Sequence, residues 1–348
     1  MTPWPDLDLL PAIALVAAAA IVTAGLIVLL RPLLVRYALA IPNRRSSHRT
    51  PTPQGGGIAV IAATIAVGGT AAVWLGVMTP LLCILLAVAA ALAMLGAVDD
   101  IRPLGAALRL ALQALAVLVV IIAMPADWRA FPALPLMLER ALVLIAGLWF
   151  VNLVNFMDGL DWMTVAEVVP IAGALAALGL AGLYPISTTL IALALFGAML
   201  GFAPFNRPVA KLFLGDVGSL PIGLLLGALL YVLATQGYLA AALILPMYYL
   251  LDATITLLRR MARGERVWEA HRQHFYQQAT DGGMSAAQVV TCIILLNLAL
   301  VALAVTTIIY PDTDIILAAT AVLLAAAMLR YFATVARRRT GKSKEKTS

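Results

Sequence analysis

Apolar runs separated by short polar segments extend along the whole chain. A helix needs about 17–25 mostly apolar residues to cross a bilayer. Runs of that length lie at residues 10–31, 58–78, 80–98, 107–125, 137–155, 164–183, 187–204, 217–235, 238–257, 287–309 and 315–333. We therefore predict an all-α integral membrane protein, a polytopic bundle of about eleven transmembrane helices, formed as one domain over residues 1–336 and followed by a basic tail at 337–348.

Composition agrees with a membrane protein. Of the 348 residues, 63% are apolar and 11% are charged, whereas soluble domains have roughly half and a quarter. Asp6 and Asp8 precede the first run, which has no basic residues ahead of it, so we expect a retained span and not a signal peptide. Cys83 and Cys292 both lie inside apolar runs, so no disulfide or metal framework is indicated.

The basic residues predict the orientation of the helices. When the segments between spans are assigned alternately to two sides, starting with the N-terminus outside, all but Arg129 and Arg140 of the 23 lysines and arginines fall inside. Because positive charge accumulates on the cytoplasmic side, we predict a periplasmic N-terminus and a cytoplasmic C-terminus. The net charge of +6 therefore reflects topology and not a nucleic-acid partner, and the basic tail is expected to contact anionic membrane lipid.

A polar helix end is predicted at residues 149–161, which read WFVNLVNFMDGLD. Its polar members follow each other in three-residue steps and should lie near one face of a helix; they are Asn152, Asn155, Asp158 and Asp161. Gly159 lets the backbone come close to a ligand. Such groups are costly near hydrocarbon and usually mark a site, although a solvated helix cap would also be polar.

Other predicted inner segments also carry acids. Asp99 and Asp100 are adjacent, so on a helix they point about 100° apart and should have different partners. Asp216 lies between Gly215 and Gly218, just ahead of an apolar run. Carboxylates from several segments, gathered beside arginines at one membrane surface, would suit a divalent metal ion and phosphate groups.

Three further features of the inner side have two interpretations each. The segment 41–60 contains Arg49 and a glycine-rich turn ahead of a helix, which suits either an anion cradle or a positively charged loop. Phe213 could stack on a base or could be an ordinary interface aromatic. His271 and His274 share a helix face beside Arg272 and could bind phosphate, but they are too few to indicate zinc.

These motifs together resemble the polyprenyl-phosphate N-acetylhexosamine-1-phosphate transferases. The resembling stretches are PNRRSSHRTPTPQGGG, VDD at 98–100, NLVNFMDGLD at 152–161, FLGDVGS at 213–219 and AHRQHFYQ at 270–277. They span nearly the whole chain in the order that the family has. The resemblance implies transfer of a sugar 1-phosphate from a UDP-amino sugar to a polyprenyl phosphate such as undecaprenyl phosphate, with release of UMP and with Mg²⁺, or Mn²⁺ in its place. It leaves a homodimer open.

The resemblance also implies roles for single residues. Asp99 matches the proposed general base and Asp100 its acidic neighbour. Asp216 matches the metal-binding aspartate, with Asn155 beside it. The remaining matches concern the substrate pocket: Asn155, Asp158 and Asp161 belong to its polar helix end, Phe213 stacks on uracil, and His271 and His274 hold phosphate. Further substrate-binding residues are expected at Asn152, Gly159, Arg49 and Arg272.

Three positions depart from the family pattern. The sequence His-Arg-Gln-His at 271–274 differs from the three consecutive histidines of the muramoyl-pentapeptide enzymes. It looks more like the branch that initiates O-antigen or other surface polysaccharides, often with 6-deoxy amino sugars. Trp162 stands where the family usually has glycine, so the ring is expected to reshape the sugar pocket, and Ile41 stands where aspartate is common.

Two other classes of protein fit the composition. A secondary transporter would place its polar groups near the bilayer midplane, often in repeated halves. Here the polar groups lie at predicted helix ends on one side, and no repeat is visible. A membrane scaffold with a degenerate site would lack part of the acid set. Release of UMP from a UDP-sugar distinguishes an enzyme from both.

The predicted topology can be tested directly. A reporter fused after Ser348 should be cytoplasmic, and a reporter ahead of Asp6 should be periplasmic, since basic segments resist translocation. Single cysteines at Arg102, Arg207 and Gln277 should react with a membrane-impermeant reagent only in inside-out vesicles. Labelling of any of these positions from the outside would show that a span has been miscounted.

Overall fold

The computed structural model describes residues 8–40, 51–266 and 271–345, with side chains as far as Arg337. Its elements in order are α1 (Leu9–Tyr37), β1 (Leu39–Ala40), β2 (Thr52–Pro53), α2 (Gly57–Ala63), η1 (Thr64–Gly68), α3 (Gly69–Trp74), α4 (Pro80–Ile101), α5 (Ala106–Ala123), α6 (Leu136–Met157), α7 (Met163–Leu180), α8 (Ile186–Asn206), α9 (Asp216–Thr235), α10 (Leu239–Ile244), α11 (Met247–Ala262), α12 (Phe275–Asp281), α13 (Ala286–Ile309), η2 (Pro311–Thr313) and α14 (Asp314–Glu345). Within these residues, 10 helical segments are long and apolar enough to cross a membrane. The predicted all-α polytopic membrane fold is confirmed.

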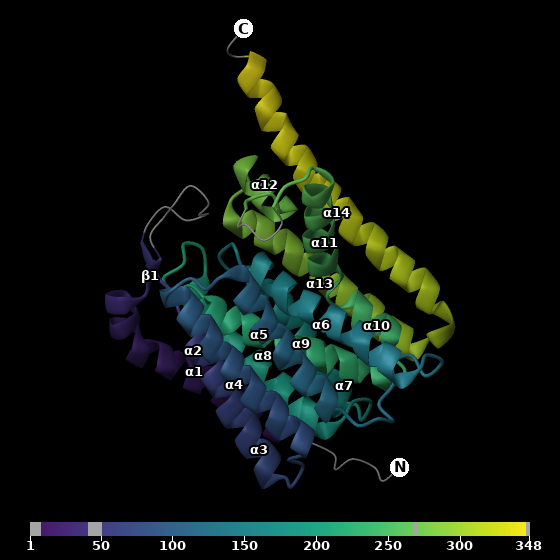
Figure 1. Ribbon diagram of the computed structural model, residues 1–348. Helices are drawn as coiled ribbons and strands as arrows, with labels where there is room; N and C mark the ends of the chain where they lie inside the picture. The colour runs from purple at the N-terminus through teal and green to yellow at the C-terminus, as the bar shows by residue number, and fades with distance from the viewer. Residues whose placement is uncertain (1–7, 41–50, 267–270, 346–348) are drawn as a thin grey trace.

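The span predicted at 238–257 is not one continuous helix. It consists of α10, with 6 residues, and α11, with 16 residues, which meet at a turn at Leu245 and Pro246. Proline has no N–H to donate and clashes with the preceding turn, so the helix breaks here. Figure 1 shows α11 running from the neighbourhood of α10 toward α12. The pair is therefore the interrupted counterpart of the ninth predicted span, which explains why ten continuous spans are found among the described residues where eleven were predicted.

Three other predicted bounds also differ from the structure. The first helix continues past residue 31 to Tyr37, and the last continues past residue 333 to Glu345. The second span ends at Trp74, short of residue 78, and contains the π-helical turn η1. Thr79 then accepts a hydrogen bond from the N–H of Leu82 and caps α4.

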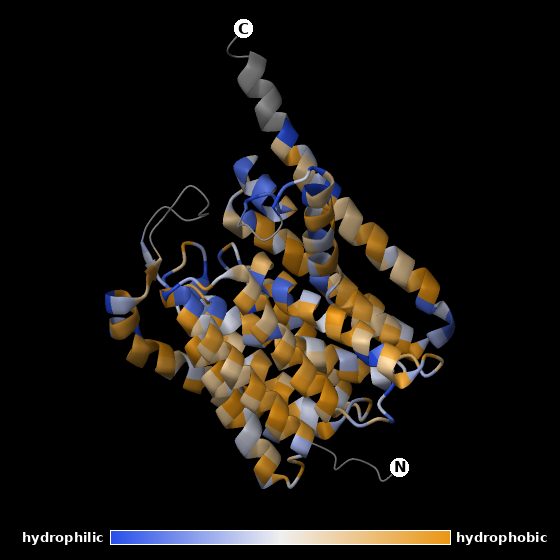
Figure 2. Ribbon diagram, in the orientation of Figure 1, coloured by the Kyte–Doolittle hydropathy of each residue, from blue (hydrophilic) through white to orange (hydrophobic). Residues whose placement is uncertain are grey.

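Helices α8 and α9 form the centre of the bundle and are buried along most of their length. Helices α1 and α7 pack on α8, and α4 and α6 pack on α9. In Figure 2 the apolar residues fill the body of the bundle, while polar residues gather at the end that carries β1 and α12. This polar end contains the ends of α4 and α6 and the start of α9.

The start of α9 is held by unusually close backbone contacts. A Cβ atom added to Gly57 of α2 would lie 2.2 Å from Cα of Gly218, and one added to Gly96 of α4 would lie 2.3 Å from the backbone carbonyl of Asp216. Small residues allow helices to approach this closely in membranes. The first turn of α9 is thereby fixed against two other helices.

A short hairpin lies beside this turn. Strand β1 pairs with β2 in an antiparallel register, Leu39 with Pro53 and Ala40 with Thr52. The chain after β2 then pairs with residue 213: the N–H of Phe213 donates to Pro53 O, and the N–H groups of Gly55 and Gly56 donate to Phe213 O. No strand was expected from the sequence, because the paired stretches are only two residues long.

The two basic residues that break the charge pattern have local partners. Arg129 forms an ion pair with the buried carboxylate of Glu139, and Arg140 donates to the carbonyl oxygens of Ile121 and Met124. Both therefore tie the α5–α6 connection to its own helices.

Replacement of Gly57 by alanine is expected to destabilise the bundle. The new methyl group would overlap the backbone of Gly218, and overpacking of this kind costs about 1–3 kcal/mol or more. Gly25→Ala is the matched control, because a Cβ there meets nothing within 4 Å. The thermal unfolding midpoint in detergent should fall for Gly57→Ala alone; equal midpoints would refute the close contact.

Candidate functional site

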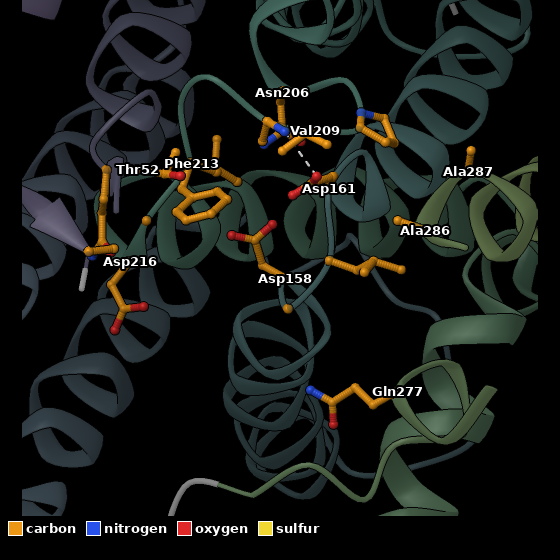
Figure 3. Close-up of a pocket in the computed structure, with 18 of the residues that line it drawn as sticks. Thr52, Asp158, Asp161, Asn206, Val209, Phe213, Asp216, Gln277, Ala286 and Ala287 are labelled. Atoms are coloured by element: carbon orange, nitrogen blue, oxygen red, sulfur yellow. Dashed lines mark hydrogen bonds between the residues drawn. The ribbon is translucent and has the colours of Figure 1, made fainter. Parts of the chain in front are cut away.

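A cavity of about 720 Å³ opens at the polar end of the bundle. It lies among the end of α6, the segment 206–216, the start of α13, and Ala40, Thr52 and Gln54 near the hairpin. Its charged and polar lining residues include Gln54, Asn155, Asp158, Asp161, Asn206, Asp216 and Gln277. Figure 3 shows the Phe213 ring and the Asp158 carboxylate projecting into the same space. Of the predicted site residues, Asn155, Asp158, Gly159, Asp161, Phe213 and Asp216 line this cavity together.

The polar stretch of α6 is split by the end of the helix. Helix α6 ends at Met157, and Asp158 is its C-terminal cap. The expectation that four polar residues share one helical face is therefore wrong for Asp158 and Asp161, which lie in the connection to α7. They reach the cavity because the chain turns there, and the backbone around Gly159 passes Tyr276 so closely that a Cβ would lie 2.2 Å from its hydroxyl oxygen.

Asp100 holds the start of α9. Its carboxylate accepts hydrogen bonds from the backbone N–H groups of Asp216 and Val217, at 3.0 and 3.2 Å, and from the side chain of Gln54. The first N–H groups of a helix have no partner within it, so Asp100 caps α9 from another helix. A Cβ at Gly215, which has a φ of 79°, would lie 2.6 Å from the same carboxylate.

Asp99 points to a different partner, as the 100° separation from Asp100 predicts. Its Oδ2 atom lies 2.9 Å from Nη1 of Arg109, and its Oδ1 accepts from the N–H of Leu104 at 2.6 Å. The same Arg109 nitrogen lies 3.8 Å from Oδ2 of Asp216. Two carboxylates from α4 and α9 therefore converge on one guanidinium nitrogen of α5.

Arg109 was not among the residues that the sequence singled out. It was counted only as a positive charge on the inner side. The signal that could have identified it is its position one turn inside the apolar helix α5, since a charged residue within a membrane span usually serves a site.

The carboxylate pair suits a divalent metal ion. Mg²⁺ prefers oxygen ligands and is commonly bound by one or two carboxylates together with substrate phosphates and water. Asp99 and Asp216 offer such a pair, although no group of three or more His, Cys, Asp or Glu residues in the described part of the chain is arranged to hold a metal. The amide nitrogen of Asn155 donates to Asp216 Oδ1 at 2.7 Å and to Ser219 Oγ at 2.9 Å, so Asn155 orients the aspartate.

The surroundings of Asp158 disfavour the ionised form of its carboxyl group. Burial raises the pKa of Asp158 to about 8, and repulsion from Asp216 and Asp100 acts in the same direction, while the hydroxyl of Thr164 donates to the carboxylate and opposes the rise. A cation brought into the cavity would favour the ionised form. The cavity is therefore rich in carboxylates and poised for a positively charged ion.

Trp162 lies next to the cavity in an unusual conformation. Its φ is 64°, in the left-handed region that glycine adopts without strain, which explains why glycine is common at this position in the resembling family. The indole N–H donates to Ala203 O at 2.6 Å, and the backbone N–H donates to Asn206 Oδ1 at 2.8 Å. The ring thus rests on α8, whereas the backbone of Trp162 is the part that contacts Asn206, a residue of the cavity lining.

His271, Arg272 and His274 belong to a second cluster beneath α12. Asp252 of α11 contacts His274 Nδ1 at 3.1 Å and accepts from the N–H groups of Phe275 and Tyr276 at 3.1 and 3.3 Å. His274 is 3% exposed, and its Nε2 atom has no partner among the described residues. The His271 ring stacks on His274.

This cluster reaches the cavity only through its neighbours. Burial, together with His274 and Arg260, lowers the pKa of His271 to about 4, whereas a phosphate nearby would favour the protonated form of the ring. Arg272 pairs with Asp281 at 3.1 Å and lines a separate hollow. The α12 residue that lines the cavity is Gln277. The predicted Arg49 and the departure at Ile41 lie outside the described residues.

An apolar groove of about 620 Å³ begins at Arg109. It runs between α5, α6 and α11, and its lining includes Leu110, Ile145, Trp149 and Leu257. Asn152 lines this groove and not the polar cavity; its amide donates to Gln113 Oε1 at 2.8 Å. Arg109, which touches Asp216 of the cavity, therefore stands where a polar and an apolar space meet.

Comparison with known proteins gives a consistent result. Residues 81–234 match the family model described as Glycosyl transferase family 4. The chain is 29% identical over 305 residues to decaprenyl-phosphate N-acetylglucosaminephosphotransferase of Mycobacterium leprae (strain TN), which covers 74% of each chain. It is 25% identical over 299 residues to the probable undecaprenyl-phosphate N-acetylglucosaminyl 1-phosphate transferase of Bacillus subtilis (strain 168), covering 81% of this chain and 82% of that one. It is 33% identical over 187 residues to a phospho-N-acetylmuramoyl-pentapeptide-transferase of Synechococcus sp. (strain JA-3-3Ab), covering 52% and 51%.

Proposed function

We propose that the chain is a phosphoglycosyltransferase of glycosyl transferase family 4 that acts on a polyprenyl phosphate, and that it transfers an N-acetylhexosamine 1-phosphate from a UDP-sugar to undecaprenyl phosphate. The observation that carries this proposal is the position of Arg109. It contacts Asp99 and lies beside Asp216 at the junction of a polar cavity and an apolar groove. A water-soluble donor and a lipid acceptor must meet at such a junction.

The donor is assigned to the polar cavity. Its volume of about 720 Å³ lies within the range of small-molecule sites. Phe213 offers a ring face for the uracil base, because its backbone is fixed by Pro53, Gly55 and Gly56. Asp158 and Asp161 approach the sugar and the diphosphate from the α6–α7 connection.

The acceptor is assigned to the apolar groove. Its lipid tail would lie along Leu110, Ile145 and Trp149, on two helices long and apolar enough to cross a membrane. Its phosphate would then reach Arg109, whose guanidinium is a strong partner for phosphate oxygens. This arrangement leaves the reacting phosphate within reach of Asp99, the proposed general base, and keeps the tail in lipid.

The proposed reaction exchanges one phosphorus–oxygen bond for another. A phosphate oxygen of the acceptor forms a bond to the sugar-linked phosphorus of the donor, and the bond from that phosphorus to the oxygen bridging the two donor phosphates breaks to release UMP. Asp100 keeps the start of α9, and with it Asp216, in place. Asp216, oriented by Asn155, would hold Mg²⁺, which would supply positive charge to the diphosphate during transfer.

The biological setting is proposed from the sequence. UDP-sugars are cytoplasmic, so the cavity is expected to face the cytoplasm at the bacterial inner membrane. The sequence His-Arg-Gln-His at 271–274 favours the first membrane step of O-antigen or another surface polysaccharide, with an amino sugar that is 6-deoxy in some members. The alternative donor is the muramoyl-pentapeptide nucleotide, because part of the chain is similar to a pentapeptide transferase.

A panel of UDP-sugars tests the function. Purified protein with undecaprenyl phosphate and Mg²⁺ should release UMP from a UDP-N-acetylhexosamine and not from the muramoyl-pentapeptide nucleotide. Asp216→Asn should reduce release by at least 10²-fold, since it removes the charge that a cation needs, whereas Asp312→Asn at an exposed site on η2 should have no effect. Release that is unchanged in Asp216→Asn at limiting Mg²⁺ would contradict the metal assignment.

Phe213→Ala tests the donor pocket. Stacking on a base is worth about 1–3 kcal/mol, and it should be similar before and during the reaction, so the KM for donor should rise about 5- to 150-fold with little change in kcat. Phe131→Ala, in the α5–α6 connection, removes an aromatic ring elsewhere and serves as the control. An unchanged donor KM in Phe213→Ala would make the ring an ordinary interface aromatic.

A further inference from the structure

A second groove, separate from the catalytic cavities, lies between α11 and α14. It comprises two adjoining hollows of about 420 and 500 Å³, which share Arg259, Ala333 and Arg337 as lining residues. Its apolar part is formed by Ile255, Phe275 and Leu329. The groove is thus apolar along one part and rimmed by arginines along another.

Positive charge dominates the walls of this groove. The guanidinium of Arg259 lies over the Phe275 ring, 4.6 Å from its centroid, and remains exposed at its end. The other charged groups that line the groove or pair with its lining residues in the described part of the chain are Arg263, Arg272, Arg330 and Arg337, together with the acids Glu265 and Asp281. Glu265 lies 3.9 Å from Arg263, and Asp281 lies 3.1 Å from Arg272. Arginines from α11, from α14 and from the segment between α11 and α12 therefore outnumber the acids.

The groove is distinct from the one assigned to the acceptor. Leu257 of α11 lines the acceptor groove, whereas Ile255 and Arg259 line the groove toward α14. Residues two apart on a helix point about 200° apart, so α11 separates the two spaces. Positive-inside topology explains arginines at this end of the bundle, but it does not require them to face each other across an apolar hollow.

We propose that this groove binds an anionic phospholipid of the bilayer. Its phosphate would lie among Arg259, Arg330 and Arg337, and an acyl chain would follow Ile255, Phe275 and Leu329. Guanidinium groups bind phosphate oxygens strongly, and arginine pairs near a membrane surface favour anionic headgroups. A free phosphate would leave the apolar part of the groove unfilled. A phospholipid would occupy both the basic part and the apolar part.

A lipid in this position would brace the elements behind the catalytic cavity. Helix α11 carries Asp252, which holds the start of α12, and α12 carries Gln277 at the cavity wall. Helix α14 packs on both α11 and α12. The bound lipid would thus join α11 to α14 on the side of α12 away from the donor.

Native mass spectrometry of the full-length protein tests this proposal independently of activity. Delipidated protein in detergent is titrated with phosphatidylglycerol, phosphatidylcholine or inorganic phosphate. We expect wild type to retain one phosphatidylglycerol in preference to phosphatidylcholine, and Arg259→Gln with Arg330→Gln to weaken its retention about tenfold or more. The matched control is Arg31→Gln with Arg36→Gln on α1, which removes the same charge from exposed positions outside the groove.

The outcomes separate a lipid site from general electrostatics. Equal weakening in the α1 variant, equal retention of phosphatidylcholine, or displacement of lipid by millimolar inorganic phosphate would each overturn the proposal. The unfolding midpoint without lipid should match wild type in both double variants. If Arg259→Gln with Arg330→Gln does not fold, each single substitution is expected to weaken retention severalfold, and wild-type retention in both would refute the groove.

Discussion

Helices that begin inside a membrane protein need acceptors for their first N–H groups, because hydrocarbon offers none. This protein supplies them as carboxylates from other segments. Asp100 of α4 accepts from the start of α9, and Asp252 of α11 accepts from the start of α12. Each acid is costly to bury alone, and each is retained because it completes a helix start.

The same constraint places the chemistry. Asp216 is the first residue of α9, so the carboxylate that caps this helix also fixes the candidate metal ligand. Gly57 and Gly96 let α2 and α4 approach α9 closely enough for that contact. His274 stands at the start of α12 and is held by the same Asp252 that caps it. The carboxylates that cap these helices therefore also hold the candidate site residues, which makes the site rigid before substrate binds.

Arg109 links the two halves of the proposed reaction. It neutralises Asp99, lies beside Asp216 and closes one end of the apolar groove. A single charged side chain within α5 thus marks where a phosphate carried by lipid can meet a diphosphate held in the cavity. The arginines between α11 and α14 form a separate basic surface, because α11 stands between them and this junction.

The sequence by itself determined the membrane fold, most of the helices and the resemblance to one transferase family. Long apolar runs form helices in lipid, since every backbone N–H and C=O group must be hydrogen-bonded within the helix. The different partners of Asp99 and Asp100 followed from the geometry of a helix. The tertiary structure decided the rest. The break at Pro246, the end of α6 at Met157 and the two destinations of Asn152 and Asp158 depend on neighbours that are distant in sequence. Gln277 could be recognised only once α12 was in place, and the carboxylate partners of Arg109 only once α5 was. The hydrophobicity of a segment can be read from its own residues. A site consists of contacts between distant segments, and those contacts exist only when the bundle has formed.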